Sequence, residues 1–284
     1  MEELDHQYSE TAGRGLVLYG SNDPEELVGE CIRQLEEPLT DPFTEEEFLV
    51  QSRGMATWLQ LKIAEKKEIF AHARFRFQEE AIWMILRGFL GQGPERNPYT
   101  KEGLAWKIFG LLPGLMQEHA PSFKPLGEYL GPHPDRDGNR TFRLCRQIAT
   151  LYDSYLTYRP EMILDWNGRD FPVGRDRWQG ILWHALRQSL GFETLPEKVE
   201  QLRQMPEPKR ADWLPERLSV FGVSTMPPLF LDVLQAYGQF RSLKIFSLQP
   251  APVFWGEVES EKWKLRALKT VSYTHLRAHE TLPY

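Results

Sequence analysis

The feature that most constrains the fold is an alternation of short apolar strands and amphipathic helices. This alternation stops near residue 70 and resumes near residue 218. Residues 16–19 and 48–51 predict buried strands, and each is followed by apolar residues at helical spacing. Further strands are predicted at 218–223 and 243–248, with a helix at 227–240 between them. Strands that alternate with helices favour one parallel α/β sheet, interrupted and then resumed.

The interruption reads as a helical lobe. A Phe-rich stretch at 70–77 leads into apolar helical patterns near 82–90, 104–115, 142–158 and 178–190, separated by loops rich in Gly and Pro. We therefore expect the organisation that follows: a disordered N-terminus at 1–14, an α/β domain from 15–77 and 214–257, an inserted helical lobe at 78–213, and the start of a truncated continuation at 258–270.

Charge and cysteine content bound the function classes. The first 50 residues hold two basic and fourteen acidic residues, whereas the rest of the chain holds 32 basic and 26 acidic ones. A mildly basic body fits either ordinary solvated surface or contact with a polyanion. The two cysteines, Cys31 and Cys145, exclude a disulfide scaffold and a Cys-based zinc module, and are expected to be buried free thiols in a reducing cytoplasm. Neither a bilayer-length apolar run nor a secretory signal is seen, so no membrane contact is expected.

Residues 271–284 are expected to be foreign to the fold. The run Val271 to Thr281 resembles the translation of a transposase-type sequencing adapter, codon by codon. This interpretation removes His275 and His279 from any metal hypothesis, although their spacing would otherwise suit one. The natural protein is then expected to continue well past residue 270.

Catalytic and nucleotide-binding signatures are missing. A phosphate-binding loop needs glycines followed by Lys and Ser or Thr, but the dipeptide Gly-Lys does not occur in this chain. The first strand is followed instead by Gly20 to Pro24 and then by Glu25 and Glu26, whose carboxylates would repel phosphates. Glu-x-Lys triplets occur at 65–67 and 207–209, but such triplets often arise by chance, and neither is expected to be catalytic; the first is expected on a solvated helix face. We expect no catalytic residue and no metal ligand in this segment.

Several runs nevertheless resemble one family in order along the chain. The most specific are Leu49 to Leu61 (LVQSRGMATWLQL), Tyr152 to Pro160 (YDSYLTYRP) and Val220 to Leu229 (VFGVSTMPPL). Shorter matches are found at 18–22, 41–43, 106, 111–113 and 254–256. Together they resemble the N-terminal region of RecC, the gamma subunit of exodeoxyribonuclease V. The resemblance implies a sheet domain like that of superfamily 1 helicases without its phosphate loop, which agrees with the missing Gly-Lys.

The resemblance also implies a role and partners. The family's holoenzyme is a heterotrimer with RecB-like and RecD-like subunits, which unwinds and resects double-strand DNA breaks for recombination repair. ATP and Mg²⁺ are used in the partner subunits, so none is expected in this segment. The gamma subunit channels double- and single-stranded DNA and scans for a hotspot sequence. Two alternatives remain open: an AddB-type ATP-dependent nuclease subunit whose nuclease domain is lost by truncation, and a purely structural protein without DNA contact.

The family's scanning positions map onto seven residues of this chain. Three agree with the family in residue type, namely Gln51, Trp83 and Leu151, and four differ, namely Arg53, Thr57, Phe77 and Thr150. Gln can bond base edges and Trp can stack on bases. On the residue alone, core packing at helical spacing with Ile82 and Leu86 is the favoured interpretation of Trp83, and Gln51 fits an ordinary turn residue equally well. Arg159 could meet phosphate or cap a helix C-terminus. The residues that differ put hotspot recognition in question more than DNA channelling.

Overall fold

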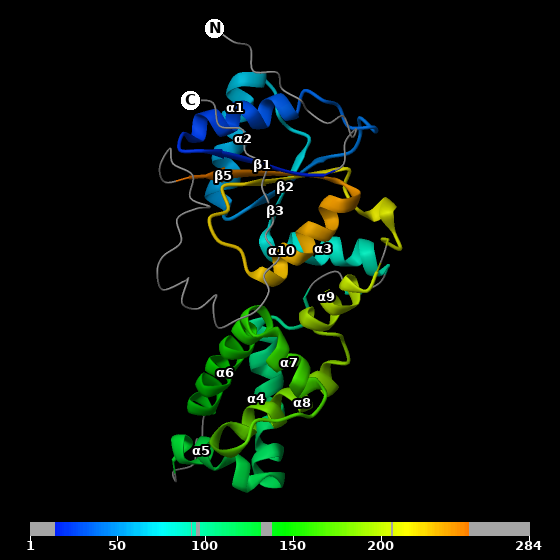
Figure 1. Ribbon diagram of the computed structural model, residues 1–284. Coiled ribbons are helices and arrows are strands. Elements are labelled where there is room, and N and C mark those ends of the chain that lie inside the picture. Colours follow the sequence, from blue (N-terminus) through cyan, green and yellow to red (C-terminus); the bar gives the residue numbers. More distant parts are fainter. Residues whose placement is uncertain (1–14, 92, 95–96, 132–137, 206, 250–284) are drawn as a thin grey trace, which may run out of the picture. The chain divides into compact units, whose positions relative to one another are not determined.

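The computed structural model describes residues 15–91, 93–94, 97–131, 138–205 and 207–249 (Figure 1). The strands within these ranges are β1 (Gly15–Ser21), β2 (Glu46–Val50), β3 (Ala73–Phe77), β4 (Arg217–Phe221) and β5 (Ser242–Leu248). The α-helices within them are α1 (Pro24–Gln34), α2 (Arg53–Lys67), α3 (Gln78–Leu90), α4 (Lys101–Glu118), α5 (Ala120–Leu130), α6 (Asn139–Tyr158), α7 (Pro160–Asn167), α8 (Arg177–Leu190), α9 (Leu195–Arg203) and α10 (Pro228–Phe240).

The described residues divide into two compact units. The first takes in residues 15–77, Glu216–Ser224 and residues 241–249. The second takes in Gln78–Pro215 and Thr225–Phe240. It therefore contains α10, although this helix lies between two strands of the sheet in sequence.

The strands of the first unit form one parallel sheet in the order β1-β5-β4-β2-β3. The parallel α/β sheet predicted from the sequence is confirmed, and each of the four predicted strands is present within two residues of its expected bounds. The sequence prediction missed β3, which lies inside the Phe-rich stretch. This edge strand alternates Arg with Phe and pairs with β2, and Arg76 donates from Nε to Glu47 Oε2 at 2.7 Å across that pair.

One face of the sheet is covered by α1 and α2 (Figure 1). The core between them contains aromatic side chains from neighbouring strands, such as Phe221 and Phe246, whose ring centroids lie 5.7 Å apart. The buried residues of this core are Leu27, Val28, Cys31, Ile32, Phe48, Val50, Leu59, Ile63, Phe221 and Phe246. Burial of this apolar set holds the strand ends, and the loops that follow them, in fixed positions.

The amino ends of the strands are tied together by Arg217. Its side chain is only 5% exposed, and its guanidinium bonds to the carboxylate of Glu46 and to the backbone oxygens of Gln34 and Glu37. A buried cation is tolerated when its donors are all directed at acceptors in this way. The contacts join the loop after α1 to β2 and β4.

The second unit is built around a helical bundle, α4 to α8, with its own apolar core. The sequence patterns predicted α3, α4, α6 and α8, and α10 beside them, and the structure confirms these helices. They missed α5, α7 and α9, which have only 8 to 11 residues each and carry a proline in the first turn. Short helices give too few turns for a clear apolar period.

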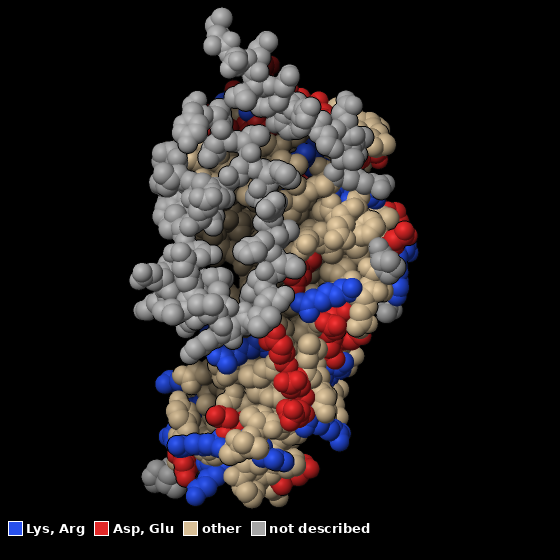
Figure 2. Space-filling view, in the orientation of Figure 1, with Lys and Arg blue, Asp and Glu red and all other residues tan. Residues whose placement is uncertain are grey.

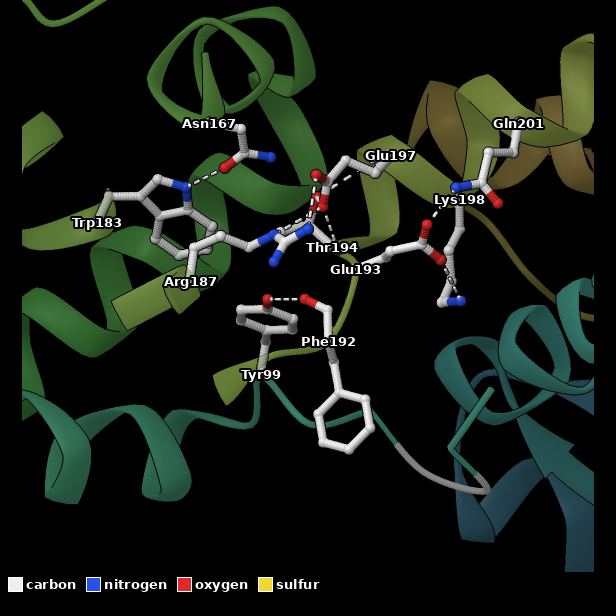
Figure 3. A network of polar contacts seen from close by, with 10 residues as sticks. All are labelled: Tyr99, Asn167, Trp183, Arg187, Phe192, Glu193, Thr194, Glu197, Lys198 and Gln201. Atoms are coloured by element: carbon white, nitrogen blue, oxygen red, sulfur yellow. Dashed lines mark hydrogen bonds and ion pairs between the residues drawn. The ribbon is translucent and has the colours of Figure 1, made fainter. Parts of the chain in front are cut away.

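A polar network joins α8 to α9 (Figure 3). Thr194 caps α9 in a reciprocal capping box with Glu197, and the same carboxylate accepts two bonds from Arg187 of α8, at 3.0 and 3.1 Å. Nearby, Trp183 donates from Nε1 to Asn167 Oδ1 at 2.8 Å. The described helices include none that is both long and apolar enough to cross a bilayer.

Candidate nucleic-acid interface

The carboxyl ends of the strands lie at one edge of the sheet because the strands are parallel. The loop after β4 turns sharply at Gly222, whose φ is 65° and whose backbone nitrogen donates to Phe246 O at 3.0 Å. The left-handed backbone conformation favours glycine here, and a Cβ at this position would lie 2.8 Å from the flexible end of Met55, at Cε. The turn brings the next residues of the loop beside the end of β2.

Gln51 lies directly after β2 at this edge, as the sequence predicted, and its side chain is exposed. Ser224, from the loop after β4, donates from Oγ to Gln51 Oε1 at 3.4 Å. The amide NH₂ group of Gln51 can donate hydrogen bonds to acceptor atoms on the edges of nucleic-acid bases. Sequence reasoning did not single out Ser224, although it follows a predicted strand just as Gln51 does.

The start of α2 adjoins Gln51 and carries no acidic residue in its first turn. Ser52 caps the helix, accepting at Oγ from Met55 N at 3.2 Å. Arg53 and Thr57 are both exposed on this helix. A helix start without carboxylates, next to an arginine, favours negative charge.

The start of α1, at the same edge, has the opposite character. Asp23 caps it and accepts from Glu25 N at 2.8 Å, and Ser21 Oγ donates to Glu26 at 2.6 Å. Three carboxylates therefore surround the helix start that would hold phosphates in a nucleotide-binding relative of this sheet. The arrangement disfavours a nucleotide there.

Phe77 ends the edge strand β3, and its side chain is 39% exposed. In the β2–β3 register it is the partner of Val50, the residue before Gln51. The structure thus gathers four of the predicted residues, Gln51, Arg53, Thr57 and Phe77, around neighbouring strand ends of the first unit.

Thr150 and Leu151 lie on α6 of the second unit. Thr150 is exposed and donates from Oγ1 to Arg146 O at 3.0 Å, while Leu151 is half-buried. In the family-like run beginning at Tyr152, Tyr152 and Leu156 are buried in the core of the bundle, and Tyr152 donates its hydroxyl to Gln179 O at 2.8 Å. Tyr158 of the same run is exposed.

Trp83 lies on α3 and is only 2% exposed. The ammonium of Lys198, from α9, lies 5.9 Å from the ring centroid, and the indole Nε1 has no hydrogen-bond acceptor among the described residues. The ring faces are therefore covered by protein in this conformation. The geometry favours the core-packing interpretation of Trp83, and base stacking by Trp83 stays a prediction.

The described side chains form no group of three or more His, Cys, Asp or Glu suited to hold a metal ion. Cys31 and Cys145 are both buried, and burial raises the pKa of Cys31 to about 12 and that of Cys145 to about 11. Such thiols carry little thiolate near neutral pH and are poor nucleophiles.

Comparison with known proteins identifies relatives of the whole described sheet and bundle. The family model described as "RecC, N-terminal domain" matches residues 16–281. The "RecBCD enzyme subunit RecC" of Escherichia coli K12 is 31% identical over 270 residues, covering 89% of this chain and 23% of that protein. The corresponding subunit of Haemophilus influenzae is 29% identical over 272 residues, covering 85% of this chain and 24% of that protein. That of Mycolicibacterium smegmatis is 24% identical over 243 residues.

This chain thus spans about a quarter of the length of these relatives. The matched range includes most of the segment interpreted above as adapter. That segment lies outside the described residues, and the adapter interpretation stays a prediction.

Proposed function

This chain belongs to the RecC family, and from that premise we propose that it is the N-terminal part of a DNA-channelling subunit of an ATP-dependent helicase–nuclease. In this proposal it assembles with RecB-like and RecD-like subunits in the cytoplasm. The assembly unwinds and resects double-strand breaks for recombination repair. The AddB-type alternative is not favoured, because the relatives reported above are all RecC subunits.

The observation that carries the DNA contact is the pairing of Gln51 with a cationic, carboxylate-free helix start. Arg53 would attract the phosphate backbone, and Gln51 would bond base edges of an unwound strand. Phe77, partly exposed at the end of the neighbouring strand, would offer a stacking surface. Thr57, one turn into α2, would border the same contact.

Thr150 and Leu151 are proposed as a separate DNA contact on α6. Trp83 is proposed to support α3 from the core, because its ring is covered. Hotspot scanning by these positions remains part of the proposal, although four of the seven residues differ in type from the family's.

The segment is proposed to have no active site of its own. The acidic start of α1 supports this for nucleotide binding, and the buried thiols support it for nucleophilic chemistry. ATP and Mg²⁺ would act in the partner subunits.

The test uses the assembled heterotrimer, made with the full-length subunit. Single-strand affinity is measured against salt concentration for Arg53→Ala and Gln51→Ala. Arg33→Ala is the control, because Arg33 is an exposed arginine in the last turn of α1, away from the carboxyl edge. Arg53→Ala should weaken binding of every sequence and reduce the salt slope by about 1.

Gln51→Ala should keep the wild-type salt slope and reduce discrimination between sequences. Equal affinity and equal slope for Arg53→Ala and Arg33→Ala would contradict the proposed contact.

A further inference from the structure

An exposed aromatic cluster lies on the bundle of the second unit, on α4 and on α6 about two turns before the α6 residues proposed to contact DNA. Trp106 of α4 packs against Phe142 of α6 with ring centroids 4.4 Å apart, and Phe109 lies 5.7 Å from Phe142. Trp106 remains 63% exposed. A large aromatic side chain that is exposed to solvent at the edge of a packed aromatic cluster is common at interaction sites.

The face of α4 that continues from Trp106 toward the C-terminus of the helix carries glycine and proline in place of larger side chains. Gly110, Pro113 and Gly114 follow on the same helix face and are exposed. Among the residues that the structure describes, a Cβ added at Gly110 or Gly114 would meet nothing within 4 Å, so none of them requires glycine at either position. Each glycine costs a helix interior about 1 kcal/mol relative to alanine. This glycine face of α4 permits another backbone to approach the helix closely.

Cations flank this aromatic surface. Arg143 and Arg146 are exposed on α6 beside Phe142, and among the described residues neither has a salt-bridge partner. Lys107 follows Trp106, and its Nζ lies 3.5 Å from Ser189 Oγ of α8. The exposed carboxylate of Glu102, one turn before Trp106, is the acidic side chain of α4 closest to Trp106 in sequence. The excess of cations would complement a partner with carboxylates beside an apolar stripe.

We propose that Trp106, Phe109, Phe142 and the glycine face of α4 form a docking surface for a helix of a partner subunit. That helix would be amphipathic, with its apolar stripe on Trp106 and its carboxylates toward Arg143 and Arg146. The inference rests on the proposed function, which supplies the partner subunits.

A nucleic-acid strand fits this surface less well. At its centre the Gly-Pro-Gly face offers no side-chain donor to phosphate. The face of the bundle seen in Figure 2 carries Lys and Arg interspersed with Asp and Glu. An apolar centre with an aromatic anchor and a charged rim is instead the usual anatomy of a protein interface.

The experiment measures assembly of the full-length subunit with its RecB-like and RecD-like partners. Gly110→Gln fills the glycine face, whereas Gly110→Ala adds only one methyl group to it and should lose less affinity than Gly110→Gln. Trp106→Ala removes the anchor, and Tyr129→Ala, an exposed aromatic on α5, is its control. We expect Gly110→Gln and Trp106→Ala to fold normally and to lose at least tenfold in affinity for the partners, and the Tyr129→Ala control to assemble like wild type.

Hydroxyl-radical footprinting of Trp106 identifies what covers it. Protection should appear in the heterotrimer and not when a single-stranded oligonucleotide is added to the subunit alone. Protection of Trp106 by the oligonucleotide alone would overturn the proposal in favour of a nucleic-acid site. The proposal would also be wrong if every variant assembled with wild-type affinity and Trp106 stayed reactive in the wild-type heterotrimer. In the latter case the wild-type trimer still forms, so the proposed function survives; a wild-type chain that fails to assemble defeats both.

Discussion

At the scale of single residues, burial distinguishes between two possible roles of the Trp83 side chain, base stacking and core packing. Trp83 has the residue type that suits base stacking, but its ring is enclosed by α3 and α9. A residue that stacks on DNA needs an open face, whereas a core residue contributes by filling volume. The two roles make different predictions for the same substitution.

Trp83→Ala should lower the free energy of unfolding by about 3–5 kcal/mol, because it leaves a large cavity. Trp83→Phe should cost clearly less, since it keeps most of the ring and removes an N–H that has no acceptor among the described residues. Urea unfolding and single-strand affinity are measured together. A stable Trp83→Ala variant with a specific loss of DNA affinity would restore the stacking role.

Cys31 gives a prediction for pH. Its thiol is fully buried, and burial raises its pKa from 9.0 to about 12. Below pH 9 the thiol is protonated in both states and makes no difference. Between pH 9 and about 12 the unfolded thiol has lost its proton and the folded one keeps it, so the free energy of unfolding falls by up to about 1.4 kcal/mol per pH unit.

Cys31→Ala should remove this part of the alkaline loss. The measurement is urea unfolding at several pH values from 8 to 11, and the quantity compared is the difference in slope between wild type and variant. Cys145→Ala should change the slope over a smaller pH range, since the pKa of Cys145 rises only to about 11. Identical slopes for all three proteins would show that neither thiol stays protonated.

At the scale of elements, two helix starts at one sheet edge differ in charge. The start of α1 carries Asp23, Glu25 and Glu26, whereas that of α2 carries Arg53 and no acid in its first turn. We expect no saturable binding of ATP, which a titration followed by the fluorescence of the nine tryptophans would check. Micromolar ATP binding that is lost on changing residues 21–26 would reverse this conclusion.

The joint between α8 and α9 depends on one carboxylate. Glu197 completes the capping box with Thr194 and accepts from Arg187 (Figure 3). Glu197→Ala should destabilise the second unit by about 1–3 kcal/mol, because charge-assisted bonds of this kind are lost. Glu197→Gln should cost less, since glutamine can also serve in a capping box. Thermal unfolding is measured for both variants and for wild type. Equal melting temperatures for all three would mean that the Glu197 contacts contribute little to stability.

At the scale of the whole molecule, the chain ends in a segment whose sequence resembles an adapter. Ending the chain at Thr270 should leave the melting temperature unchanged, because residues 271–284 are predicted to add nothing to the fold. Resequencing of the gene should give a different continuation after about Thr270. An intact genomic clone that encodes the same tail would refute the interpretation.

Local sequence determined much of this protein. Apolar periodicity predicted four of the parallel strands, and it predicted α10 between two of them. These features depend on residues close together in the chain, where backbone geometry and side-chain spacing act directly.

Tertiary structure decided the rest. The pairing of β3 with β2 made an edge strand of the Phe-rich stretch, which the sequence analysis did not predict as a strand. The approach of Ser224 to Gln51, and the burial of Trp83 under Lys198, depend on residues 173 and 115 positions apart. Such contacts arise from packing between distant segments, so no local pattern carries them.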